Sequence, residues 1–243
     1  MSSVDRWQIR LSSEARTRNC SRLYSQWLVL ESVCAIESVV QLILLGNSAD
    51  SAIIFRSVFD LLINIMYIER DIPLRSLLFA RNEVQGYLQF LQRQLEMDIG
   101  LRQEIESEIK KCENQIKEYD REIMLTDRNL RIPQGSRWSG KQIEQMARDV
   151  GLRKEFSGMY WLISGISHST GTASHLYLTF NDKGGLSPNF YPNDSLSKEI
   201  ARGTAYVSFR VLNVVDRNVK LGKSRGIEQL RKKIECGFWK AVN

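Results

Sequence analysis

The stretch Ser51–Arg70, SAIIFRSVFDLLINIMYIER, decides the fold because it is apolar around nearly its whole circumference. A helix of this kind has to be covered on all sides, as the central helix of a bundle is. The preceding segment, Ser12–Leu45, has a helical pattern that ends at Gly46-Asn47, and Ile72-Pro73 is expected to close the central helix. We therefore predict an all-α protein built as a helical bundle.

The composition is that of an ordinary soluble globular chain: 243 residues, 43% hydrophobic and 26% charged. The 4 cysteines and 2 histidines show no metal-ligand spacing, so neither a metal nor a cofactor is expected. The most hydrophobic stretch, Leu28–Leu45, is interrupted by Glu31, Glu37 and Gln41, which argues against a membrane span. These features predict a cytoplasmic protein.

Residues 74–127 show the most regular apolar repeat in the chain. Val84, Leu88, Leu91 and Leu95 form one stripe, and a second stripe runs from Ile105 to Ile123 after a break that contains Gly100. The phase is lost across the break, so we predict an antiparallel coiled-coil hairpin; one straight helix through Gly100 is the alternative. The predicted division is a discontinuous bundle, 1–73 and 131–243, with a hairpin insertion at 74–130 that binds a protein partner or a second copy.

The second half of the chain is expected to be helical with one exception. Leu176–Phe180 and a second short run to Tyr191 flank turn residues, which predicts a small β-hairpin or an ordered loop. Helices are predicted for Leu152 to about Ser167, for Ser195 to about Val219, and for Ile227–Val242.

Three polar residues interrupt the apolar central helix. Arg56, Asp60 and Asn64 lie at i, i+4 and i+8 and so share one face. Burying a charge there is costly unless it is paired. Two interpretations stay open: an internal ion pair held by Asn64, or a polar cavity inside the bundle.

Both histidines fall in one block rich in small hydroxylated residues. If the helix continues, Tyr160, Ser164 and His168 lie along one face, and His168 can act as a general acid or base, as histidine does near neutral pH. His175 follows seven residues later. The alternatives are a hydrogen-bonded interior histidine at 168 and a solvent-facing one at 175.

A third block surrounds Trp138. An aromatic residue beside a glycine turn, with Lys141 at a helix start, can hold an anion or stack on a base. The alternative is a loop anchored by one buried tryptophan. The spacing of a phosphate-binding loop is absent, which disfavours a nucleotide triphosphatase.

The net charge of +6 is concentrated at one end of the chain. Residues 217–243 hold eight basic and two acidic residues. This distribution predicts a contact with nucleic acid or another anion, or simply a solvated basic tail. The basic residues expected to make such a contact are Arg225, Arg231, Lys232 and Lys233.

The order of these blocks resembles a bacterial helical family of unknown function, DUF5677. The matching residues are Arg56-Ser57-Val58-Phe59-Asp60, then Trp138-Ser139-Gly140, then Tyr160 through Ser164 to His168. The acid is Asp60 where the family pattern more often has Glu, and the resemblance implies no activity. A looser likeness is to HEPN-type helical domains, many of which are ribonucleases, although their usual Arg–His spacing on one helix is missing here.

Three functional hypotheses follow. The first is a toxin-like or antiphage-defence effector, in its enzymatic form a metal-independent ribonuclease, that acts on RNA. In it His168 is the acid or base, Arg56 holds phosphate and Asp60 orients one of them. The second is a non-catalytic interaction module that assembles through 74–130. The third is a sensor in which the polar residues surround a small anionic ligand; the predicted ligand contacts are Asn64, Trp138, Lys141, Tyr160, Ser164 and His175.

Overall fold

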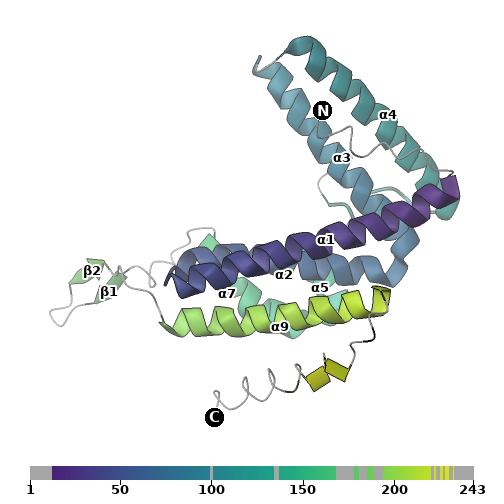
Figure 1. Cartoon of the computed structure of the whole chain (residues 1–243). Helices are drawn as coiled ribbons and strands as arrows, with labels where there is room; N and C mark the ends of the chain where they lie inside the picture. The colour runs from purple at the N-terminus through teal and green to yellow at the C-terminus, as the bar shows by residue number, and fades with distance from the viewer. Residues whose placement is uncertain are drawn as a thin grey trace. The chain divides into compact units, whose positions relative to one another are not determined.

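In the computed structural model the central apolar segment forms α2 (Ser48–Ile68), drawn with the rest of the chain in Figure 1. The structure describes residues 13–98, 101–133, 137–167, 178–180, 185–188 and 194–219, together with Gly222, Arg225, Gly226, Glu228, Gln229 and Lys232. The side chains of Phe55, Phe59, Leu62 and Ile63 are at most 1% exposed, so α2 is covered on several sides, as its sequence predicts.

The helix before it, α1 (Ser13–Leu44), ends where the sequence predicts. Gly46 has a φ of 80°, which a residue without Cβ adopts at little cost. The N–H of Gly46 donates to the carbonyl of Ile43, and that of Asn47 donates to the carbonyl of Leu42. These two hydrogen bonds together form a Schellman motif, which pairs carbonyl groups at the end of the helix that would otherwise have no partner.

The chain divides into two units. Unit 1 comprises residues 1–27 and 67–142, and unit 2 comprises residues 28–66 and 143–243. The division predicted from the sequence, with boundaries at 73/74 and 130/131, remains a prediction.

The junction after α2 differs in detail from the expectation. A 3-10 turn, η2 (Glu69–Asp71), leads directly into α3 (Ile72–Glu96), and Ile72 has helical dihedral angles (φ −56°, ψ −48°). The break falls instead at Asp71, whose side chain accepts a hydrogen bond from the N–H of Leu74. Pro73 therefore starts a helix rather than ending one, because a proline in the first turn removes no hydrogen bond that the helix would make.

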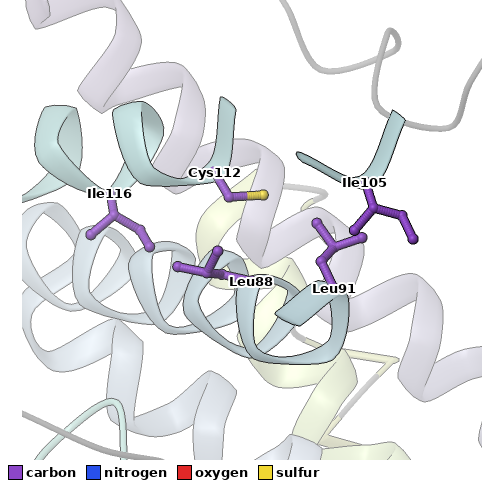
Figure 2. Packing of buried hydrophobic residues seen from close by; sticks show 5 residues of the cluster. All are labelled: Leu88, Leu91, Ile105, Cys112 and Ile116. Carbon is purple, nitrogen blue, oxygen red and sulfur yellow. The ribbon is translucent and has the colours of Figure 1, made fainter. Parts of the chain in front are cut away.

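The predicted antiparallel hairpin is confirmed. Helix α3 packs against α4 (Arg102–Thr126), and Asp98 takes a φ of 53° in the turn between them. Figure 2 shows the buried side chains that pack between the two helices. The buried cluster consists of Leu88, Leu91, Ile105, Cys112 and Ile116, flanked by Val84, Leu95 and Ile109.

A charged pair fixes the two helices relative to each other at the end away from the turn. The guanidinium of Arg81 on α3 donates from Nε and Nη2 to the two carboxylate oxygens of Asp120 on α4. A two-pronged contact of this kind adds directionality to the apolar packing.

Unit 2 contains a series of short helices followed by a long one. The short elements are α5 (Ile143–Asp149), α6 (Arg153–Glu155), the π-helical turn η3 (Phe156–Tyr160) and α7 (Trp161–Ser167). The long helix α9 (Asp194–Val219) contacts them through a 2.8 Å hydrogen bond from the Tyr206 hydroxyl to Glu155. The helix predicted from Leu152 to about Ser167 is confirmed in extent, because α6, η3 and α7 follow one another without a break from Arg153 to Ser167. The π turn within it forms where Gly158 weakens the α-helical preference.

The one pair of strands in the described part of the chain is short. Strand β1 (Leu178–Phe180) pairs antiparallel with β2 (Leu186–Pro188), with Thr179 opposite Ser187. Nearly everything else described is helical, so the all-α class is confirmed. Most of the helix predicted at Ile227–Val242 lies outside the described residues.

Two described segments are long and apolar enough to cross a membrane, judged by length and composition only. They are Trp27–Leu44, which is 17% buried, and Ser48–Glu96, whose most apolar stretch of 18 residues is 56% buried. This is weak evidence, because a buried core helix meets the same criteria.

The hairpin core allows a stability prediction. Leu88→Ala removes a buried side chain, so we expect the free energy of opening α3 from α4 to fall by about 2–5 kcal/mol. Hydrogen exchange of α4 amides measures this. Gln92→Ala, at an exposed position on the same helix, is the control and should change it by less than about 0.5 kcal/mol. Equal exchange in both variants would contradict the packing described.

Candidate functional site

Arg56 on α2 and Tyr160 at the end of the π turn meet within unit 2. The Nε and Nη2 groups of Arg56 donate to the Tyr160 hydroxyl over 3.4 and 3.5 Å, at the long end of the hydrogen-bond range. The guanidinium carbon lies 5.5 Å from the centre of the Tyr160 ring, within cation–π distance. The two residues are 104 positions apart in sequence, so the fold alone brings them together.

Asp60, one helical turn after Arg56, completes this cluster. Burial raises the pKa of its carboxyl from 3.8 to about 6, although the positive charge of Arg56 and a hydrogen bond from Tyr160 act in the opposite direction. Its Oδ1 atom is buried and accepts no hydrogen bond from the described residues. The effect of burial on the pKa of Asp60 is therefore larger than the opposing effects of Arg56 and Tyr160. The carboxyl consequently titrates closer to neutral pH than an exposed aspartate does.

The Tyr160 hydroxyl links the two charged groups. It accepts from Arg56 and interacts with Asp60, a combination that one donor hydrogen and two lone pairs allow. Burial also raises the pKa of Tyr160, partly offset by the hydrogen bond from Arg56. The phenol thus stays protonated and can keep donating to the carboxylate.

Aromatic rings surround the tyrosine. The ring of Phe156 stacks on that of Tyr160 with centroids 4.2 Å apart and an angle of 18°, and Phe59 of α2 lies 6.1 Å away on another side. Phe156 and Tyr160 begin and end the π turn. Such single π turns are rare and are often found at functional sites. The turn and the stacked rings orient the Tyr160 hydroxyl toward α2.

The cluster is not sealed from solvent. Arg56, Asp60 and Asn64 are each partly exposed along α2, whereas Tyr160 is 9% exposed. The arrangement therefore combines a fixed cation, a carboxyl that can exchange a proton near neutral pH and a protonated phenol. A carboxyl with a pKa close to the working pH suits general acid–base chemistry, and a guanidinium suits an anionic substrate.

Of the other site residues predicted in unit 2, the structure describes Ser164 and Asn64. Ser164 is partly buried on α7, one turn after Tyr160, and Asn64 lies one turn after Asp60. His168 and His175 lie outside the described residues, so their predicted roles remain predictions.

Trp138 is a core residue of unit 1. It is 9% exposed, and its ring packs edge-on against Tyr67 at 5.6 Å and Phe79 at 5.3 Å. Lys141 lies 5.6 Å from the Tyr67 ring centre, while the hydroxyl of Ser139 accepts from the Lys141 N–H. These contacts agree with a loop anchored by a buried tryptophan, and the ligand-binding role of Trp138 and Lys141 stays a prediction.

The basic segment is described only in part. Arg225 and Lys232 are exposed, and Arg231 and Lys233 lie outside the described residues. Within the part of the chain that the structure describes, no group of three or more His, Cys, Asp or Glu side chains is placed to hold a metal ion.

Sequence reasoning named Arg56, Asp60 and Tyr160 but missed Phe156. The i, i+4 spacing of Phe156 and Tyr160 is a signal that was present in the sequence. The π turn between them gives no comparably clear pattern, because Gly158 is equally compatible with a loop or a helix end.

The cluster lies within the region that matches a known family. Residues 27–186 match the model of the Family of unknown function (DUF5677), which covers well over half of the chain. The chain belongs to this family. No curated protein and no solved structure matches the chain. The resemblance predicted from the order of the motifs is thereby confirmed, and in this DUF5677 protein the first and third motifs meet at Arg56, Asp60 and Tyr160.

The raised pKa of Asp60 predicts a pH-dependent stability difference. Because the folded pKa, about 6, exceeds the reference value of 3.8, the ionised carboxylate destabilises the fold above about pH 6, and this cost disappears as the pH falls below 3.8. Asp60→Asn should therefore stabilise the protein at about pH 8 by up to about 3 kcal/mol and have little effect at about pH 3.5. Denaturant unfolding at the two pH values measures this.

The exposed Glu31 provides the matched control, since Glu31→Gln should leave the free energy of unfolding almost unchanged at both pH values. Destabilisation by Asp60→Asn at about pH 8 would show that the carboxylate is a net stabilising ion-pair partner.

The hydrogen bond from Tyr160 to Asp60 predicts that the pKa of Asp60 depends on the tyrosine hydroxyl. Tyr160→Phe removes the hydrogen bond that favours the ionised carboxylate, so the pKa of Asp60 should rise above about 6. Carbon-13 NMR of the aspartate carboxyl groups follows this titration. Tyr206→Phe, which removes the tyrosine hydroxyl bonded to Glu155 elsewhere in unit 2, should leave the Asp60 titration unchanged. An equal shift in both variants would argue against a direct Tyr160–Asp60 bond.

Proposed function

We propose that this protein is a cytoplasmic effector that cleaves RNA at the cluster formed by Arg56, Asp60 and Tyr160. The observation that supports this best is a carboxyl with a pKa of about 6 beside a guanidinium and a buried tyrosine. Maintaining such a group costs folding free energy, and costly ionisable groups of this kind concentrate at functional sites.

Each residue has a chemical role in this proposal. Arg56 holds a non-bridging phosphate oxygen, for which a guanidinium is well suited. Asp60, largely ionised at neutral pH, is the general base, and Tyr160 orients it. His168 is the proposed general acid, on the sequence argument that it follows Tyr160 and Ser164 at helical spacing.

The reaction needs no further reactant. Asp60 takes the proton of a ribose 2′-hydroxyl while the 2′ oxygen bonds to the adjacent phosphorus. The bond from phosphorus to the 5′ oxygen breaks, and that oxygen receives a proton from His168. The products are a 2′,3′-cyclic phosphate and a free 5′-hydroxyl. Proton transfers of this kind contribute about 10²–10⁴-fold in rate.

Exposed cations at the C-terminal end support an anionic substrate. Residues 217–243 hold eight of the chain's 34 basic residues and two of its 28 acidic residues, and Arg225 and Lys232 are exposed. In this proposal they contact the RNA backbone outside the cleavage site. We further propose that this RNA cleavage serves a toxin-like or antiphage-defence role, which is the role of many HEPN-type ribonucleases.

The test is cleavage of single-stranded RNA, with detection of the cyclic phosphate end. The rate should rise with pH through about 6, where Asp60 loses its proton, and Asp60→Asn should lower it by roughly 10²–10⁴-fold. Arg56→Ala should mainly raise the KM, because it removes the phosphate contact. His168→Ala tests the general acid separately.

The matched control is Arg148→Gln, which removes another unit 2 arginine from an exposed ion pair with Glu144. It should leave cleavage unchanged. Binding of RNA without cleavage, or equal cleavage by the Asp60→Asn variant, would refute the catalytic proposal.

A further inference from the structure

A pocket in unit 1 lies beside the second family motif and belongs to a different unit from the Arg56–Asp60–Tyr160 cluster. Its volume is about 420 Å³, within the range of roughly 300–1,000 Å³ that small-molecule sites occupy. The first wall of the pocket is the segment Leu130–Pro133, the second wall is Ser139–Gly140, and Leu78 of α3 also lines it. The pocket is therefore large enough to hold a small molecule.

The first wall is fixed by a turn that follows α4. The N–H of Leu130 donates to the carbonyl of Asp127 over 3.3 Å, and the N–H of Asn129 donates to the Oδ1 atom of Asp127 over 3.0 Å. Leu130, Ile132 and Pro133 are all partly buried. The first wall is thus mainly aliphatic and is held in place by the loop itself.

The second wall is fixed by the buried tryptophan of the motif. Trp138 packs edge-on against Phe79 of α3, and the N–H of Gly140 donates to the carbonyl of Arg137 over 2.9 Å. Gly140 has a φ of 70°, which favours glycine, and a Cβ added to it would lie 3.4 Å from Cγ of Pro133. The two walls approach each other at this point, and a glycine leaves more room between them than any other residue would.

The loops around the pocket carry an excess of positive charge. Residues 127–142 include four cations, Arg128, Arg131, Arg137 and Lys141, and one acid, Asp127. Within the part of the chain that the structure describes, the three arginines form no ion pair. Arg131 lines the pocket and is exposed, and none of the described lining residues is acidic. These charges favour an anion as the occupant.

We propose that this pocket binds a small carboxylic acid with an apolar body. The carboxylate pairs with the guanidinium of Arg131, which can donate two parallel hydrogen bonds to it. The apolar body packs against Leu78, Leu130 and Ile132, and its removal from water supplies the rest of the affinity. This inference does not depend on RNA cleavage at the cluster in unit 2.

The composition of the walls favours an aliphatic acid over a nucleotide. A base would need an aromatic surface for stacking, and the ring of Trp138 is buried in the core of the unit at 9% exposed. Besides Arg131, Ser139 is the one residue with a polar side chain among the described lining residues. The pocket therefore offers few groups that would recognise the edge of a base.

Isothermal titration calorimetry of the full chain with octanoate tests the proposal. The unaltered protein should bind octanoate saturably at one site, and Arg131→Gln should weaken this binding at least about tenfold, which corresponds to about 1.4 kcal/mol. Octan-1-ol lacks the negative charge, so its weaker binding should be the same in both proteins. Arg128→Gln, which removes another exposed arginine from the same loop, is the matched control and should change octanoate binding less than about twofold.

NMR of the backbone amides locates the bound octanoate without any substitution. The largest shift changes should fall on Leu130–Ile132 and Ser139–Gly140. Ile132→Trp, which places a larger side chain in the first wall, should abolish binding while the circular dichroism spectrum stays that of the unaltered protein.

Three results would overturn the proposal. The first is the absence of saturable octanoate binding by the unaltered protein. The second is equal binding by the Arg131→Gln and Arg128→Gln variants. The third is binding that is kept in Arg131→Gln but lost in Val33→Asp, which would place the acid on the exposed apolar side of α1 instead.

Discussion

An ionisable carboxyl on an otherwise apolar helix is the constraint around which unit 2 is organised. Phe55, Phe59 and Leu62 of α2 are completely or almost completely buried, so the polar groups of this helix have few places to find partners. Asp60 is compensated by the charge of Arg56 and by the Tyr160 hydroxyl, which comes from a different part of the chain. The compensation is incomplete, since the pKa remains raised.

The π turn explains how Tyr160 reaches α2. Stacking on Phe156 and contact with Phe59 hold the phenol ring, while the hydroxyl faces Arg56. The turn is an irregularity in an otherwise α-helical segment. The region that matches the family model includes both α2 and the π turn. Since the family has no known function, the chemistry of the cluster has to be inferred from its side chains.

Unit 1 is stabilised mainly by the regular packing of apolar side chains between its helices. The heptad positions of α3 and α4 bury one another, and Arg81 and Asp120 fix their alignment. Trp138, which stands in the second family motif, packs with Tyr67 and Phe79 in the core of this unit. Residues of one family pattern thus divide into those that build a core and those that form a polar cluster. Spacing in the sequence does not distinguish the two kinds, because both use aromatic and small residues near turns.

The sequence by itself determined the elements whose pattern is local. The all-α class, the end of α1 at Gly46, the antiparallel hairpin and the shared face of Arg56, Asp60 and Asn64 all follow from helical periodicity and turn residues. Only the tertiary structure decided that Tyr160 is the partner of Arg56 and Asp60, that a π turn interrupts the helix before α7, and that Pro73 begins a helix. The physical reason is that pKa values and hydrogen bonds depend on groups far apart in the chain, and periodicity carries no information about which helices meet.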